Sequence, residues 1–162
     1  MERKTRYSPA DRLNLKMVIA LLRAVKALEA KVSPCFKGGG VTFAQFGALE
    51  FLYHKGPARV SVITDKTLST AGNMTVVLRN LMRLGLARRQ PDPADGRASV
   101  IGLTPKGEAL MRGLFPGHLR LLREFFGALG EREKENLVKS LRGLPGRELL
   151  GTRSCGVNKE GL

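Results

Sequence analysis

Apolar residues recur every three or four positions along the first part of the chain, which is the spacing of an amphipathic helix. This pattern predicts a helix from about Pro9 to Val32, with Ser8 as its N-cap. Ser33-Pro34 should end that helix, and residues 37–40 should form a loop. The apolar positions are Leu15, Val18, Ile19, Leu22, Val25, Leu28 and Val32.

A second helix is predicted from Thr42, because Thr42 and Gln45 have the spacing of a capping box, and Gly56-Pro57 should end it. Its apolar residues cover more than one face, so we expect it to be buried on two sides. Residues 60–67 predict a short helix and 68–72 a turn. A further helix is expected from about Thr70 to Leu84, with Gly85 just beyond its end.

The next segment alternates like a β-hairpin, with strands expected at 86–90 and 98–103. The proline-rich tip at 91–96 looks too long for a two-residue turn. Two more helices are predicted, at about 105–129 and 131–144, and from Pro145 onward glycine and charge indicate a loose tail.

Helix, turn, helix and hairpin in this order are typical of a winged helix-turn-helix. The predicted fold class is therefore mainly α with a small β-wing, flanked by N- and C-terminal dimerisation helices. We expect one domain over residues 1–145, with the DNA-binding part at about 42–104, the dimerisation helices at about 9–32 and 105–145, and a flexible tail at 146–162.

The charge narrows the choice of partner. The 162 residues include 28 Lys and Arg against 14 Asp and Glu, a formal net charge of +14 with a pI near 10.6. Such a chain is attracted to polyanions, so nucleic acid and an anionic membrane surface are candidates, and a solvated basic surface without a partner is the alternative. No apolar run reaches membrane-span length, which argues against insertion, and the start lacks the apolar run of a signal peptide.

The helix near 70–84 carries the strongest candidate site. At about 100° per residue, Met74, Val77, Leu78 and Leu81 share one face, which should be buried. The opposite face has no acid and offers side chains that can read base edges, while Gly72 lets backbone N–H groups approach a phosphate. The candidate DNA-binding residues of this region are Ser69, Thr70, Gly72, Asn73, Thr75, Val76, Arg79, Arg83 and Arg88. The alternative is that these arginines are merely solvated.

Two residues of the hairpin complete the candidate site. Arg97 follows the tip and can enter a minor groove, which attracts arginine when narrow. Asp95 is expected to hold the wing by pairing with a basic residue such as Arg89; the alternative is a simple Asx-turn.

Other chemistry has little support in the sequence. His54 and His118 lack partners at metal-ligand spacing, and Cys35 and Cys155 form no CxxC pair, so we expect no metal site, no disulfide framework and a reducing cytoplasm. Cys35 is interpreted as a bystander thiol and His118 as a polar residue that could line a cleft. No catalytic set or phosphate-binding loop is present, so the chain is not expected to be an enzyme or to need a cofactor.

Four motifs in order resemble the MarR family of regulators. The run from Ser69 to Arg89 resembles that family's recognition helix and following strand, and Asp95-Gly96-Arg97 resembles its Asp-x-Arg wing motif. Residues 103–107 resemble the Leu-Thr-x-x-Gly that ends the wing, and residues 52–57 resemble the stretch before the first DNA-domain helix. Gly96 and Gly130 depart from the pattern, where a basic residue and a Ser or Thr cap are usual.

The resemblance covers residues 10–145 and implies a homodimer with interlocking terminal helices. It also implies an effector cleft, often for small phenolic or anionic compounds. The predicted function is a dimeric, sequence-specific regulator of transcription, usually a repressor, that leaves a pseudo-palindromic double-stranded operator when an effector binds. The alternative is a constitutive architectural or RNA-binding protein that uses the same basic surface.

Overall fold

A computed structural model describes residues 7–67 and 69–145 of the chain. The predicted tail at 146–162 lies outside the described residues. A first unit of the chain ends at Phe125 and a second begins at Phe126, and each is described by itself. The first unit contains α1 (Pro9–Gly38), α2 (Phe43–Lys55), α3 (Val60–Lys66), α4 (Ala71–Arg83), β1 (Ala87–Asp92), β2 (Asp95–Leu103) and α5 (Pro105–Phe125), and the second contains α6 (Glu131–Arg142).

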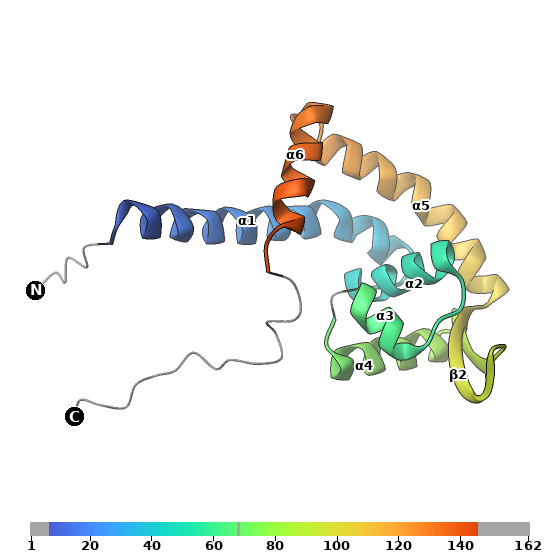
Figure 1. Ribbon diagram of the computed structural model, residues 1–162. Coiled ribbons are helices and arrows are strands. Elements are labelled where there is room, and N and C mark those ends of the chain that lie inside the picture. The colour runs from blue at the N-terminus through green and yellow to red at the C-terminus, as the bar shows by residue number, and fades with distance from the viewer. Residues whose placement is uncertain (1–6, 68, 146–162) are drawn as a thin grey trace, which may run out of the picture. The chain divides into compact units, whose positions relative to one another are not determined.

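The predicted fold class is confirmed, since helices dominate and the two described strands form one antiparallel sheet (Figure 1). Helix starts follow the predicted caps. The Ser8 hydroxyl accepts a hydrogen bond from the Asp11 amide at 3.0 Å, and the Thr42 hydroxyl accepts one from the Gln45 amide at 3.2 Å. Each pair is a complete capping box, which satisfies amide groups that have no partner within the helix.

The end of α1 was predicted too early, because the helix continues through Pro34 to Gly38. Proline has no amide hydrogen, so one helical hydrogen bond is lost at this point. Burial compensates for the loss: Phe36 is fully buried one half-turn later, and its ring stacks on Phe46 of α2 with 4.0 Å between centroids. The amides of Gly39 and Val41 both donate to the Phe36 carbonyl and end the helix there.

α2 is the centre of the core, as its apolar residues on more than one face predicted. It packs against α1, α3, α4, α5 and β2. Side chains from every one of these elements are fully or almost fully buried around it. They include Phe36, Phe46, Leu49, Leu52, Ile63, Met74, Leu81, Ile101 and Met111.

The hairpin tip differs from the prediction of a long connection. Both strands extend further, and Asp92 pairs with Asp95, which leaves only Pro93 and Ala94 between them. Next to that pair, towards the base of the hairpin, the register between β1 and β2 shifts, because Pro91 lies opposite Ser99. The three residues 96–98 of β2 are therefore unmatched on β1. Such an irregularity bends a hairpin and redirects its side chains.

The two C-terminal helices are slightly shorter than predicted. α5 ends at Phe125 rather than near 129, followed by a turn in which the Leu129 amide donates to the Phe126 carbonyl. Gly127, a poor helix former, lies in this turn. α6 begins after Gly130 without a side-chain cap, and its first turn holds Glu131 and Glu133. Across the described ranges, no helix has the length and apolarity needed to cross a membrane.

The end of α4 packs closely against the start of α5. Gly85 has φ +70°, which glycine adopts without strain, and the chain turns there as predicted. The Thr104 hydroxyl donates to the Gly85 carbonyl at 2.6 Å, and Lys106 Nζ donates to the Leu84 carbonyl at 2.9 Å. Gly107 lies directly against the Leu86 backbone, so a side chain at this position would meet the Leu86 carbonyl oxygen.

Replacing Gly107 by Ala should therefore destabilise the fold by about 1–3 kcal/mol, because backbone must move to admit the methyl group. The matched control is Gly113→Ala on the same helix, where an added Cβ meets nothing within 4 Å. That change should stabilise the protein by roughly 0.5–1 kcal/mol, since alanine favours a helix more than glycine does. Urea unfolding of both variants measures the difference, and equal stabilities would contradict the close approach.

Candidate nucleic-acid interface

The two faces of α4 are separated as the sequence predicted. Met74, Val77, Leu78 and Leu81 are all buried against the core. The structure brings most of the predicted site residues together on the opposite, exposed face, and Val76 is 49% exposed among them. The exposed members are Gly72, Asn73, Thr75, Val76, Arg79 and Arg83.

The start of α4 is fixed by its own side chains. Thr70 is the N-cap, and its hydroxyl accepts from the Asn73 amide at 3.2 Å. The Asn73 side-chain amide donates to the half-buried Ser69 hydroxyl at 2.9 Å. This bond uses one hydrogen of the Asn73 amide group. The group still has a second N–H, which can donate to adenine N7, and a carbonyl oxygen, which can accept from the adenine N6 amino group. A Cβ at Gly72 would meet nothing within 4 Å, so the backbone is open there.

The two neighbouring arginines of β1 point in different directions, because side chains alternate along a strand. Arg89 lies with Arg79, Thr75 and Val60 around a hollow of about 210 Å³ between the helices and the wing. Arg88, the predicted site residue, instead lines a hollow of about 340 Å³ that also contains Tyr53 and Glu108. Arg89 is therefore the strand residue that accompanies the α4 face, and sequence reasoning missed it as a site residue.

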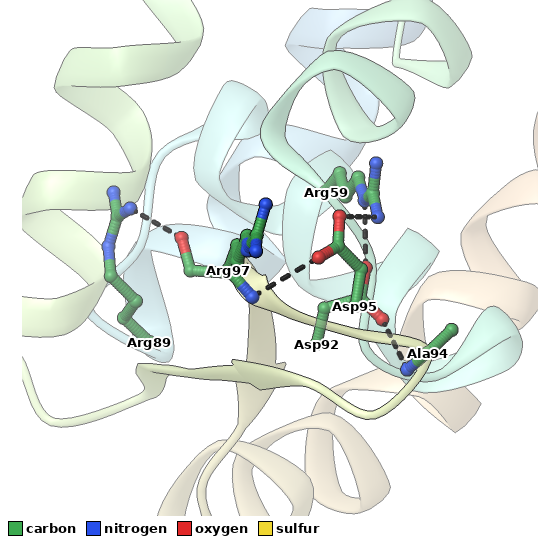
Figure 2. A network of polar contacts seen from close by, with 7 residues as sticks. Arg59, Arg89, Asp92, Ala94, Asp95 and Arg97 are labelled. Carbon is green, nitrogen blue, oxygen red and sulfur yellow. Dashed lines mark hydrogen bonds and ion pairs between the residues drawn. The ribbon is translucent and has the colours of Figure 1, made fainter.

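The expected pairing of Asp95 with Arg89 is wrong. Arg89 donates instead to the Ser99 hydroxyl across the hairpin, at 2.7 Å. Asp95 faces Arg59, whose Nη2 lies 3.4 Å from its carboxylate, and its other oxygen accepts the Arg97 amide at 3.1 Å (Figure 2). Both predicted roles of Asp95, the ion pair and the Asx-turn, thus occur together. The Arg97 side chain is exposed on the same strand.

Arg59, just before α3, is a second residue that the sequence analysis missed. Its Nε donates to Asp92 at 2.7 Å, so one guanidinium meets both acids of the wing tip. The pKa of Asp92 is lowered, first by the hydrogen bond that it accepts from the Ala94 backbone amide and next by its hydrogen bond with Arg59. Asp92 in turn raises the pKa of Arg59. The signal in the sequence was weak, since the partners are 33 residues apart.

Among the residues that the structure describes, no group of three or more His, Cys, Asp or Glu side chains could hold a metal ion. Cys35 is half-buried, and its thiol lies 3.9 Å from the Leu114 carbonyl.

His118 is buried rather than exposed on a cleft wall. It is only 7% exposed, and its ring lies 5.4 Å from Phe36 and 4.8 Å from Phe46, centroid to centroid. Its Nδ1 has no hydrogen-bond partner among the described residues. Burial lowers the pKa of His118, and the carboxylate of Glu50 opposes this shift.

Comparison with known proteins decides the family. Residues 39–98, which run from before α2 into β2, match the model of the MarR family. The chain is 32% identical over 129 residues to the HTH-type transcriptional regulator MhqR of Bacillus subtilis (strain 168), covering 80% of this chain and 89% of that protein. The chain belongs to the MarR family.

Solved structures agree with this assignment. The regulator BpsR of Bordetella bronchiseptica superposes with a TM-score of 0.70 at 27% identity, covering 78% of this chain and 96% of that one. Sco3205, a MarR-family regulator of Streptomyces coelicolor, has the same fold, with a TM-score of 0.74 at 21% identity and coverage of 91% and 96%. In this MarR-type winged-helix regulator, α3 and α4 are the helix-turn-helix, and β1 and β2 are the wing.

The burial of His118 in this MarR-family chain predicts a pH-dependent stability. Its folded-state pKa lies below the ordinary value of 6.5, so the unfolded chain binds more protons as the pH falls below that value. The free energy of unfolding should therefore decrease as the pH is lowered through about 6.5 towards 5. The decrease should be smaller in His118→Phe, which cannot be protonated.

Urea unfolding of both proteins at a series of pH values provides the measurement. The quantity of interest is the difference between the two slopes, since titratable groups that do not contact His118 contribute alike in both proteins. Parallel curves for wild type and variant would show that His118 does not carry the effect.

Proposed function

We propose that this MarR-family regulator binds double-stranded DNA sequence-specifically, with α4 in the major groove and the wing beside the adjacent minor groove. The observation that carries the proposal is the exposed face of α4, which has no acidic residue and lies opposite a fully buried face. A helix held by one face in this way presents a fixed set of side chains to a groove. A cytoplasmic location follows from the same proposal.

The residues have different roles in this arrangement. Asn73, Thr75, Val76 and Arg79 lie in the first half of α4 and are proposed to reach base edges, as an amide, methyl groups and a guanidinium can. Arg83, one turn later, is proposed to contact a phosphate. Ser69, Thr70 and Gly72, at the helix start, are proposed to let α4 approach the DNA backbone, and Arg97 supplies the proposed wing contact. Arg88 remains a proposed DNA-binding residue, although it lines a different hollow from Arg79 and Arg89.

A homodimer is the second part of the proposal. The first half of α1 carries large apolar side chains that are half exposed in the single chain, including Val18, Leu22 and Val25 at 53%, 65% and 56%. Monomeric proteins rarely leave such a contiguous patch in water. A two-fold dimer would bury it against its own copy and place two copies of α4 for a pseudo-palindromic operator. α6 carries a second exposed stripe of Leu137, Val138 and Leu141.

Regulation by a small molecule is the third part. BpsR is 27% identical to this chain, and its DNA binding is regulated by 6-hydroxynicotinic acid, an anionic aromatic compound. By analogy we propose a repressor that leaves its operator when a small phenolic or anionic effector binds. The architectural or RNA-binding alternative is not favoured, and specificity separates the two: a regulator should prefer its operator over random DNA by about 10³ or more.

Binding-site selection on variants of α4 tests the proposed recognition. Arg79→Ala should cost about 1–3 kcal/mol and reduce preference at one base position of each half-site. Arg83→Ala should weaken binding to all sequences alike and lower the salt slope by about one. Selection across a salt series measures both effects. If Arg83→Ala changes the selected motif and Arg79→Ala does not, the proposed facing of α4 is wrong.

A charge placed on the exposed face of α1 tests the dimer. Leu22→Glu should convert the protein to a monomer at micromolar concentration, because a carboxylate would be buried without a partner. Ala27→Glu places the same charge on the polar side of the same helix, at an exposed position, and should leave the dimer intact. Light scattering of both variants gives the masses. A wild-type monomer, or equal masses for the two variants, would rule out this interface.

A further inference from the structure

The wing is attached to the helix-turn-helix at two separate places. Near its base, Ala58 exchanges two backbone hydrogen bonds with Ile101, at 3.0 and 2.8 Å. At its tip, Arg59 binds both Asp92 and Asp95 (Figure 2). Ala58 and Arg59 are consecutive residues that lead directly into α3. One short segment thus holds both ends of the hairpin.

The two acids of the tip are not equivalent. Asp92 lies 2.7 Å from Arg59 with its side chain 11% exposed, whereas Asp95 lies at 3.4 Å and is 49% exposed. The second oxygen of Asp92 accepts the Ala94 amide at 2.9 Å and closes the two-residue turn. The second oxygen of Asp95 accepts the Arg97 amide, so this acid acts on the residue that faces the DNA.

Arg59 contributes to α3 through its backbone, because its carbonyl accepts the Ile63 amide at 3.1 Å. Arg59 is at the N-cap position but makes no side-chain capping bond. Its guanidinium is directed instead at the wing, across 33 positions of sequence. The register shift between Pro91 and Asp92 brings the two acids opposite each other, where one guanidinium can bind both.

We propose that Arg59 and Asp92 are positioning residues for DNA binding, and that their ion pair fixes the wing so that Arg97 faces the minor groove. Asp92 lies outside the Asp-x-Arg motif, whose own acid, Asp95, orients the backbone of Arg97 locally. The pair acts through Arg97 and leaves the α4 contacts untouched. This inference rests on the proposed DNA-binding function.

Charge alone predicts the opposite effect on DNA affinity when Asp92 is replaced. Removing an acid from a DNA-facing surface reduces repulsion from phosphates and should tighten binding. If Asp92 positions the wing, its removal should weaken binding in spite of the more favourable net charge. Asp92→Asn is the suitable change, because asparagine keeps an oxygen for the Ala94 amide and loses only the ion pair.

The experiment compares wild type, Arg59→Ala, Asp92→Asn and the double variant in binding-site selection and in affinity for the selected DNA. Each single change should weaken binding by roughly twofold to fivefold, the range of an exposed ion pair. Base preference should decrease at the outer positions beside the wing and remain at the positions read by α4. The double variant should bind no more weakly than the single variants, since both remove one interaction.

Two further variants complete the design. Arg59→Lys keeps the charge but loses the fork that binds two carboxylates, and should restore only part of the preference. Arg112→Ala removes one exposed basic residue from α5 and controls for the loss of charge alone. This variant should leave the base preference at the outer positions of the motif unchanged. Thermal unfolding of all variants separates an effect on wing position from a general loss of protein stability.

The outcomes distinguish the inference from the proposed function. If wild type selects no DNA sequence, the proposed function fails first. If wild type selects a motif but Asp92→Asn binds equally well or more tightly, the positioning role is overturned. Additive losses in the double variant would also overturn it, because the two residues would then act separately.

Discussion

The buried face of α4 is the constraint on which the interface depends. Met74, Val77, Leu78 and Leu81 fix the rotation of this helix against the core, and with it the direction of every exposed residue. A rotation by one residue, about 100°, would expose leucine and bury arginine, and both changes are unfavourable. The direction of the proposed recognition surface is therefore set by the apolar packing beneath it rather than by its own polar groups.

The same core connects this surface to α1 and α5. Phe36 of α1 stacks on Phe46 of α2, and His118 of α5 lies against both rings. Because α2 also packs on α3, α4 and β2, a change in the α1–α5 region can reach the helix-turn-helix through α2. A close-packed aromatic cluster transmits such displacements better than a flexible linker would. This physical connection is what a ligand-controlled DNA-binding protein requires.

Short-range signals in the sequence predicted most of the fold. The caps at Ser8 and Thr42, the turn at Gly85 and the two faces of α4 each depend on residues within a few positions of one another. The errors lie where distant residues decide. α1 continues through Pro34 because Phe36 packs on another helix, and Asp95 pairs with Arg59 because the hairpin register brings them together. Likewise, only the strand register shows that Arg89 rather than Arg88 faces α4.

The charge of the chain explains attraction to DNA but not selectivity. A formal charge of +14 draws the protein to any polyanion, and this attraction contains no sequence information. Acids at the wing tip oppose the attraction, yet Asp92 and Asp95 lie there with hydrogen bonds to Ala94, Arg97 and Arg59. In so basic a protein, a small loss of general affinity matters little. A wing with a defined position contributes more, because only a fixed side chain discriminates one groove from another.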